Sequence, residues 1–261
     1  MTAYLARCAM ADLLRVESLA KRFGGIVATD DLTLSIPEGE LHAVIGPNGA
    51  GKTTLIAQLS GQLAPDSGRI HFGSNDITEM SMPSRSLLGL ARSFQITSLF
   101  LDLSVLDNVA LAVQAHSGHS FHFWRNARRE PELRDPAQAA LARVGLDARA
   151  DLPASALSHG EHRQLELAMA LASRPRMLLL DEPMAGLGPE ESARMVSILR
   201  DLKKELTILL VEHDMEAVFA LADRITVLVY GRVIASGRPD DIRNNAQVRD
   251  AYLGEQEAVH G

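Results

Sequence analysis

A glycine-rich segment, GPNGAGKTT at residues 46–54, constrains this chain most strongly. It follows an apolar run at 41–45 and precedes a helical pattern that begins at about Lys52. Its glycines let the backbone turn N–H groups inward, and the next helix adds the positive end of its dipole. An ordinary glycine-rich turn is the alternative, but a strand, this loop, a Lys-Thr pair and a helix together predict a phosphate-binding loop.

The end of this loop predicts individual roles. Lys52 can reach the β- and γ-phosphates of a nucleotide, and the hydroxyl of Thr53 is placed to bind a Mg²⁺ ion that bridges them. Thr54 begins the helix behind them. The predicted phosphate-binding residues are Gly46, Pro47, Asn48, Gly49, Ala50, Gly51, Lys52, Thr53 and Thr54.

Composition limits the class of protein. A chain of 261 residues with 46% hydrophobic content can bury a substantial core. Its 26 basic and 33 acidic residues give a net charge of −7, so we expect no nucleic-acid partner. The single cysteine, Cys8, cannot form an intrachain disulfide, which favours a reducing interior. No apolar run approaches the roughly 18 residues of a membrane helix, so we expect that the chain does not itself span a membrane.

The remaining patterns alternate between strands and helices. Predicted strands lie at 14–19, 32–36, 41–45, 69–72, 177–180, 207–211 and 225–230. Predicted helices begin at about 52, at 189 and near 215. Between about 105 and 173 helical spacing replaces the strand signals, which predicts an inserted helical subdomain. The early strands indicate a small antiparallel part beside a nucleotide-binding α/β core.

Two carboxylates follow the apolar run MLLL at 177–180. Adjacent residues at a strand end point in different directions, so Asp181 can bind the Mg²⁺ shell while Glu182 faces the attacking water as general base. A solvated acidic turn is the alternative. His213 follows another apolar strand, so it emerges at the carboxyl edge where open α/β sheets bind ligands. We predict that it contacts phosphate.

In this order the motifs resemble those of the nucleotide-binding subunits of ABC transporters, from about residue 13 to residue 255. The resemblance implies a Walker A loop at 46–54 and a Walker B strand with catalytic glutamate in MLLLDEP. It also implies that Gln95, in ARSFQ, senses Mg²⁺ and the γ-phosphate and contacts the membrane partner. Phe23, in KRFGG, matches the aromatic residue that stacks on adenine, with a packing role as the alternative.

The segment LSHGE at 157–161 corresponds to the family's signature motif, usually LSGGQ. The resemblance implies that Ser158 and Gly160 bind the γ-phosphate held by an opposite subunit, so two complete sites require two such domains, as a homodimer or a heterodimer. His159 and Glu161 depart from the motif, and we expect them to weaken ATP affinity in the dimer. Gly188 stands where many relatives have an aspartate, so this chain lacks the side chain that usually couples the two ATP sites.

Several stretches look like the ATP subunits of branched-chain amino-acid importers, above all the tail SGRPDDIRNNAQVRDAYLGE. That resemblance implies ATP and Mg²⁺ as cofactors, integral-membrane permease subunits, indirectly a periplasmic solute-binding protein, and a cytoplasmic location on the inner face of the plasma membrane. The solute itself stays open. The alternative is an ABC-type ATPase that is not coupled to transport. Other ATPases or a GTPase would be favoured by coiled-coil arms, a second nucleotide domain or an NKxD motif. The sequence has none of these.

The expected organisation is a single nucleotide-binding domain at 13–261 after an N-terminal extension at 1–12, with the helical subdomain at about 96–175 and a C-terminal tail at about 237–261. Residues 116–124, HSGHSFHFW, hold three histidines at a spacing of three. They could ligate a metal, but we expect a solvated loop because no fourth ligand is close in sequence.

Overall fold

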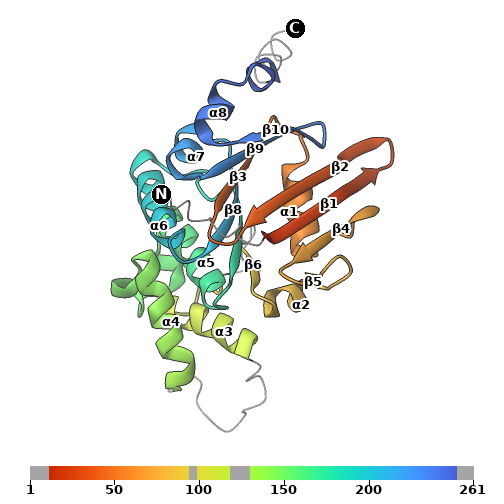
Figure 1. The fold of residues 1–261 in the computed structure, drawn as a ribbon. Coiled ribbons are helices and arrows are strands. Elements are labelled where there is room, and N and C mark those ends of the chain that lie inside the picture. The colour runs from red at the N-terminus through yellow and green to blue at the C-terminus, as the bar shows by residue number, and fades with distance from the viewer. Residues whose placement is uncertain (1–11, 94–98, 118–129, 252–261) are drawn as a thin grey trace, which may run out of the picture. The chain divides into compact units, whose positions relative to one another are not determined.

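A computed structural model describes residues 12–93, 99–117 and 130–251 of the chain (Figure 1). These residues form two compact units. The first unit comprises the described residues up to Met80 and those from Ala222 onward, and the second unit comprises the described residues of Ser81–Leu221. Each unit is described by itself.

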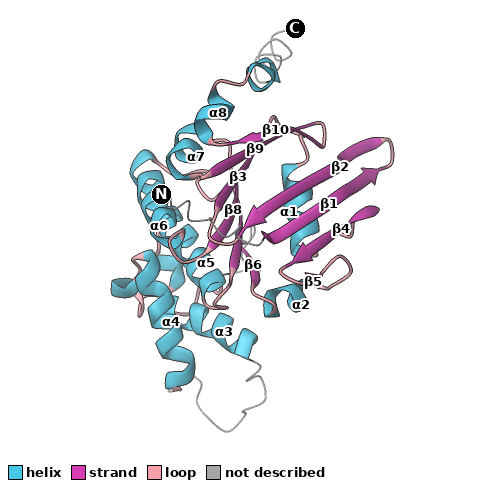
Figure 2. Ribbon diagram, viewed as in Figure 1, coloured by secondary structure: helices cyan, strands magenta, loops and turns pink. Residues whose placement is uncertain are grey.

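The first unit contains an antiparallel four-stranded sheet in the order β2-β1-β4-β5 (Figure 2). Its strands are β1 (Asp12–Phe23), β2 (Ile26–Pro37), β4 (Ser67–Phe72) and β5 (Asn75–Asp76). Along β2 buried and exposed residues alternate, as expected for a sheet with one face toward a core.

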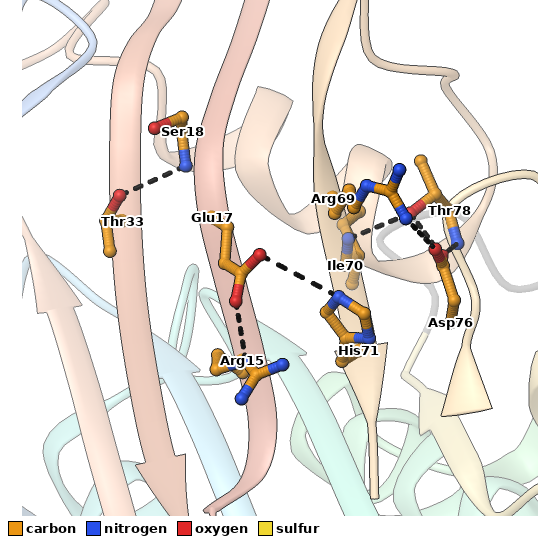
Figure 3. A network of polar contacts seen from close by, with 9 residues as sticks. All are labelled: Arg15, Glu17, Ser18, Thr33, Arg69, Ile70, His71, Asp76 and Thr78. Atoms are coloured by element: carbon orange, nitrogen blue, oxygen red, sulfur yellow. Dashed lines mark hydrogen bonds and ion pairs between the residues drawn. The ribbon is translucent and has the colours of Figure 1, made fainter. Parts of the chain in front are cut away.

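Polar contacts fix the register of this sheet near a bulge in β1 (Figure 3). Ser18 adopts a φ of 46°, and its N–H donates to Thr33 Oγ1 of β2 at 3.1 Å. On the same strand Glu17 contacts Arg15 Nε at 2.8 Å and His71 Nε2 of β4 at 3.9 Å. The irregular backbone at Ser18 therefore keeps a hydrogen-bond partner where the ladder is interrupted.

The first unit also holds the strand that leads into the phosphate-binding loop. This strand, β3 (Leu41–Ile45), runs parallel to β9 (Arg224–Val229), and β10 (Arg232–Gly237) pairs with β9 in the antiparallel direction. All five residues of β3 are buried, as is typical of a parallel strand covered on both faces. The helices of this unit are α1 (Lys52–Ser60) and α8 (Pro239–Arg243).

The second unit contains three parallel strands in the order β8-β7-β6. They are β6 (Leu90–Arg92), β7 (Met177–Asp181) and β8 (Thr207–Val211). Every residue of β7 and β8 is buried, and Asp181 is the register partner of Val211. The carboxyl ends of these two strands therefore deliver Glu182 and Glu212 side by side.

Helices make up the rest of the second unit. They are α2 (Met82–Leu87), α3 (Val105–Ser117), α4 (Pro131–Val144), α5 (His159–Leu171), α6 (Pro189–Leu202) and α7 (Met215–Leu221), with 3-10 turns η2 (Asp147–Arg149) and η3 (Ala154–Ala156). Helices α3, α4 and α5 pack against one another. Helix α6 begins as its sequence predicts, with Pro189 in the first turn and two glutamates near the positive end of the dipole.

The structure extends the predicted secondary structure in several places. Strands β1 and β2 run beyond the predicted 14–19 and 32–36, and five short elements were not predicted: β5, β6, β10, α2 and α8. Within the described ranges no helix is long and apolar enough to cross a membrane. Cys8 and most of the histidine-containing segment, residues 118–124, lie outside the described residues.

Candidate functional site

The phosphate-binding loop forms a compact turn between β3 and α1. The N–H of Ala50 donates to Pro47 O at 3.1 Å, and Ala50 O accepts from the N–H of Gly231, in the β9–β10 turn, at 2.9 Å. Helix α1 starts after Gly51, which has a φ of 101°, and its first turn carries no acidic residue. The positive end of this helix is therefore available to an anion.

Two glycines of the loop are required by close backbone contacts. A Cβ atom at Gly46 would meet the carbonyl oxygen of Leu228, and one at Gly51 would meet that of Ala28. Gly49 also has a positive φ, 78°, but a Cβ there would meet nothing within 4 Å. Packing within the first unit thus restricts Gly46 and Gly51, whereas Gly49 is restricted by its backbone conformation alone.

We expect Gly46→Ala to lower the free energy of unfolding more than Gly49→Ala does. Both substitutions place a side chain at a positive φ, but only the first forces the backbone of β9 to move, which costs about 1–3 kcal/mol more. Denaturant unfolding of the two variants and the parent chain measures the difference. Equal stability of the two variants would contradict the packing that surrounds Gly46.

Lys52 lies over the loop that it follows. Its Nζ donates to Gly46 O at 2.6 Å and to Pro47 O at 2.9 Å, and the residue is only 7% exposed. Asn48, Gly49 and Thr53 are exposed at the same loop and helix start. The loop therefore presents backbone N–H groups, a hydroxyl and a fixed ammonium group within a single short segment.

Phe23 lies at the end of β1 and is 49% exposed. The Nζ atom of Lys21 lies 5.8 Å from the centroid of its ring. A large aromatic ring that is half exposed offers a stacking face, as the predicted adenine contact requires. Its exposure argues against a purely core-packing role.

In the second unit, Asp181 is held by a cation that sequence reasoning missed. Arg92, the last residue of β6, places its Nη2 atom 3.1 Å from Asp181 Oδ2, and both side chains are buried, at 9% and 1% exposure. The sequence signal was present, because ARSFQ contains Arg92 three residues before Gln95. Gln95 itself lies outside the described residues.

Glu182 and His213 approach each other beyond the ends of β7 and β8. His213 Nδ1 lies 3.9 Å from Glu182 Oε1, and the side chains are 64% and 31% exposed, respectively. Glu182 has a φ of 51°, an uncommon conformation for a residue with a side chain. Such strained conformations cluster at functional sites, and here the turn directs a partly exposed carboxyl group away from the buried strand.

A second glutamate at this edge was not among the predicted site residues. Glu212 is 1% exposed, and its carboxyl group accepts backbone hydrogen bonds from Met184, His213 and Asp214 at 2.9, 3.0 and 3.4 Å. The signal that could have found it is the one used for Asp181, a carboxylate directly after a buried apolar strand.

Helix α5 begins at the signature segment with a capping box. Ser158 Oγ accepts from the N–H of Glu161 at 3.2 Å, and Glu161 Oε2 accepts from the N–H of Ser158 at 2.9 Å. Glu161 Oε1 also lies 3.2 Å from Arg149 Nε. The carboxylate of Glu161 thus binds the Ser158 N–H and Arg149 within its own unit. Its predicted effect on the phosphate of a partner chain is separate from these contacts.

The groups expected to bind a phosphate across a dimer meet a carboxyl group of their own unit. Glu191, in the first turn of α6, accepts at Oε1 from the N–H of Gly160 at 3.2 Å and from Ser158 Oγ at 3.4 Å. Its Oε2 accepts from the N–H of Gly188 at 3.3 Å. A Cβ atom at Gly160 would lie 2.6 Å from Glu191 Cδ, so a side chain at this position would have to displace the carboxyl end of Glu191.

The structure describes the predicted site residues in two separate groups. Residues 46–54 and Phe23 belong to the first unit, while Asp181, Glu182, His213, Ser158 and Gly160 belong to the second. Among the described residues no cluster of three or more His, Cys, Asp or Glu side chains is arranged to hold a metal ion. The chemistry present is that of a phosphate-binding loop and, separately, of carboxylates beside a histidine.

Comparisons with known proteins identify the family. A family model described as ABC transporter matches residues 29–185, so the chain belongs to the ABC transporter family and its enzymatic activity is that of an ATPase. A second model, described as branched-chain amino acid ATP-binding cassette transporter, matches residues 232–258. The resemblance predicted from the motifs is confirmed.

Individual relatives agree with this assignment. The chain is 38% identical over 250 residues to a high-affinity branched-chain amino acid transport ATP-binding protein, LivG, of Salmonella typhimurium, covering 93% of this chain and 98% of the relative. It is 37% identical to BraF of Pseudomonas aeruginosa, with the same coverage. It is also 33% identical, over 95% of this chain and 99% of the relative, to a lipopolysaccharide export ATP-binding protein, LptB, of Acidithiobacillus ferridurans.

Solved structures confirm the fold class predicted from the sequence, an α/β P-loop ABC nucleotide-binding domain with an antiparallel β subdomain and an inserted helical subdomain. The chain resembles an ATP-binding cassette in its ADP conformation with a TM-score of 0.83 and 31% identity, over 94% of this chain and 99% of the other. A nucleotide-free cassette gives a TM-score of 0.82 with 30% identity, over 93% and 99%.

Proposed function

We propose that this chain is the ATP-hydrolysing subunit of an importer for branched-chain amino acids or related small polar solutes. The observation that carries the proposal is the match of its C-terminal segment, residues 232–258, to the branched-chain family model. The relatives named for branched-chain amino-acid transport are 36–38% identical, against 33% for the relative named for lipopolysaccharide export. The sequence does not identify the transported solute, so urea, short amides and other amino acids remain candidate solutes.

For binding, Phe23 stacks on adenine and residues 46–54 surround the phosphates, with Lys52 as the fixed cation. The nine-residue loop fits this role because its glycines, its helix N-terminus and its ammonium group converge on one turn. Oxygen donors are the ligands that Mg²⁺ prefers, and Thr53, Gln95 and Asp181 supply a hydroxyl, an amide carbonyl and a carboxylate. Bound Mg²⁺ would neutralise phosphate charge.

For hydrolysis, Glu182 is the general base that orients and polarises the attacking water, and His213 contacts the γ-phosphate. Their side chains are partly exposed and lie 3.9 Å apart, so both can meet one substrate group without first being uncovered. Arg92 offsets the charge of Asp181 beneath them, at 3.1 Å. Two carboxylates lie near the His213 ring, Glu182 and Glu212, and only that of Glu182 is partly exposed, so Glu182 is the one in position to act on water.

A complete catalytic site requires a second ATP-binding subunit, because Ser158 and Gly160 act on the nucleotide of the opposite chain. In the described chain these donors bind Glu191 Oε1. A phosphate oxygen arriving from a partner would take over the same donors, so pairing of two subunits includes the displacement of this carboxyl group. His159 lies beside Gly186, whose Cβ would be 3.2 Å from its Nε2, so its bulk is directed within its own unit.

The remaining partners follow from an importer's architecture. We propose integral-membrane permease subunits as direct partners, a periplasmic solute-binding protein as an indirect one, and a peripheral location on the cytoplasmic face of the plasma membrane. We also retain the proposal of one nucleotide-binding domain over residues 13–261, with an extension at 1–12, a helical subdomain at about 96–175 and a tail at about 237–261. The ATPase that is not coupled to transport is the less favoured reading.

The test is purification of the tagged full chain from gently solubilised membranes, followed by identification of its partners and reconstitution in proteoliposomes. We expect two integral-membrane subunits, and ATP hydrolysis stimulated by a binding protein loaded with leucine, isoleucine or valine. Stimulation by a different solute class would overturn the branched-chain assignment while leaving the importer. Hydrolysis by a chain that purifies from its native cells without any membrane partner would favour the uncoupled ATPase.

A further inference from the structure

Glu212 is a fully buried acidic residue that none of the proposed roles uses. It follows β8 directly, and its side chain is 0% exposed. A buried carboxyl group is costly unless its oxygens accept hydrogen bonds, and here each oxygen does so. Oε1 accepts from the N–H of Met184 at 2.9 Å, and Oε2 accepts from the N–H groups of His213 at 3.0 Å and Asp214 at 3.4 Å.

These hydrogen bonds join two different segments of the second unit. Met184 belongs to the turn that follows Glu182, in which the N–H of Ala185 donates to Glu182 O at 3.1 Å. His213 and Asp214 belong to the loop that connects β8 to α7, where the N–H of Ala217 donates to Asp214 Oδ1 at 3.1 Å. One side chain therefore holds the backbone after Glu182 and the backbone of His213 at a fixed separation.

The turn at Glu182 needs such support. On its N-terminal side the N–H of Glu182 donates to Val211 O at 2.8 Å, which continues the pairing of β7 with β8. The residue then adopts a φ of 51°, which costs free energy for a residue with a side chain and persists only where surrounding contacts determine it. The bond from Met184 to Glu212 supplies a contact on the C-terminal side of this turn.

We propose that Glu212 is a positioning residue for ATP hydrolysis, which sets the distance between Glu182 and His213 without touching the nucleotide. The inference rests on the proposed roles of those two residues as base and phosphate contact. The side chains of Glu182 and His213 are partly exposed and make a contact of 3.9 Å, and Glu212 Oε2 lies 3.7 Å from His213 Nδ1. Glu212 therefore sets the separation of the two groups through the backbone that it holds and through its own contact with the His213 ring.

The chemistry of the side chain explains why glutamate is needed. A carboxylate offers only acceptors, on two oxygens, and three N–H groups point at it. Glutamine has the same size but replaces one oxygen with an NH₂ donor. In either orientation of the amide, its NH₂ group faces a backbone N–H, and two donors cannot form a hydrogen bond. Either the turn after Glu182 or the loop at His213 therefore loses its hydrogen bond to this side chain.

The experiment compares Glu212→Gln with Glu216→Gln in the full chain. Glu216 lies four residues further on, in the first turn of α7, and is exposed. We expect Glu212→Gln to reduce kcat for ATP by about 10- to 100-fold, because displacement of reacting groups by about 1 Å costs up to ~10²-fold in rate. The KM for ATP and the binding of a fluorescent ATP analogue should change by less than about threefold, since the residue touches no nucleotide. Glu216→Gln should leave kcat and KM at the parent values.

Hydrogen exchange provides a readout that a loss of overall stability would not mimic. In the parent chain the amides of Met184, His213 and Asp214 should exchange slowly. In Glu212→Gln either the amide of Met184 or those of His213 and Asp214 should exchange faster, while the amides of β7 and β8 remain protected. Exchange of all three at unstructured rates in the parent chain would overturn the proposal. So would a parent-like kcat in a folded Glu212→Gln variant.

Two further results keep the inference separate from the proposed function. If Glu182→Gln retains parent turnover, the catalytic assignment fails; if it is inactive while Glu212→Gln is fully active, only the positioning role fails. Should Glu212→Gln not fold, Glu212→Asp replaces it, because it keeps the charge and shortens the reach by one methylene. The same loss of kcat at nearly constant KM is expected, and an unchanged kcat would overturn the proposal.

Discussion

Replacing Lys52 with alanine should abolish measurable ATP hydrolysis and weaken ATP binding by at least about tenfold. A hydrogen bond to a charged group contributes about 1.5–3 kcal/mol, and Lys52 supplies the fixed cation at the predicted phosphate position. Removal of a preorganised group that stabilises developing charge lowers kcat by roughly 10²–10³-fold, in addition to the loss of binding. Steady-state ATPase assays and equilibrium binding of a fluorescent ATP analogue measure both effects.

Lys204→Ala is the matched control for this prediction. Lys204 pairs with Asp201 at 2.7 Å on an exposed face of α6 and its following turn, where both side chains are about 70% exposed. Exposed pairs of this kind contribute little to stability, so the control should hydrolyse ATP at the parent rate. Parent turnover in Lys52→Ala would remove the basis for the phosphate-binding loop. Loss of activity in both variants would point to unfolding, which circular dichroism detects.

Local sequence signals were sufficient wherever one short segment determines its own structure. The loop at 46–54 could be predicted because strand, glycines, lysine and helix start are contiguous. Strands β7 and β8 could be predicted because each contains a run of four apolar residues, which can be buried on both faces. The short strand β10 was missed because its residues are half exposed and its pairing with β9 depends on a tight turn at Tyr230 and Gly231.

The contacts that complete the site come from residues far apart in the sequence, and motif reading does not reveal them. Arg92 and Asp181 are separated by 89 positions, and Gly160 and Glu191 by 31. The sequence predicted a phosphate contact for Gly160, but it did not reveal that Glu191, in the first turn of α6, accepts the hydrogen bond of its N–H group. The position of Glu212 after an apolar strand is a local signal, but its contact with Met184, 28 positions away, is not visible in the sequence.

Glu182→Gln should stop hydrolysis while ATP binding persists. Glutamine keeps the size of the side chain and its ability to hydrogen-bond water, but it cannot accept a proton, and loss of a general base lowers rates by about 10²–10⁴-fold. The substitution should not disturb the fold, because the side chain is 31% exposed and its contact with His213 is long, at 3.9 Å. We therefore expect a kcat reduced by at least ~10²-fold and an affinity for ATP close to that of the parent chain.

Glu190→Gln is the control, because Glu190 is exposed in the first turn of α6 and the substitution removes the same charge. It should hydrolyse ATP at the parent rate. Adjacent Glu191 is unsuitable, since its carboxyl group binds Gly160 and Ser158 and its removal would alter the predicted dimer surface directly.

The Glu182→Gln variant also tests whether the catalytic site is shared between two chains. If the γ-phosphate held by one chain is bound by Ser158 and Gly160 of another, uncleaved ATP joins the two, and Glu182→Gln with ATP and Mg²⁺ should accumulate as a dimer in light scattering. The parent chain cleaves the nucleotide and should remain largely monomeric. The dimer must disappear when Gly160→Asp is added, because the new side chain lies where Glu191 and the phosphate bind and carries a like charge. An inactive Glu182→Gln that binds ATP yet stays monomeric, even at high concentration with its membrane partners present, would restrict the site to one chain and leave the signature segment without its proposed role.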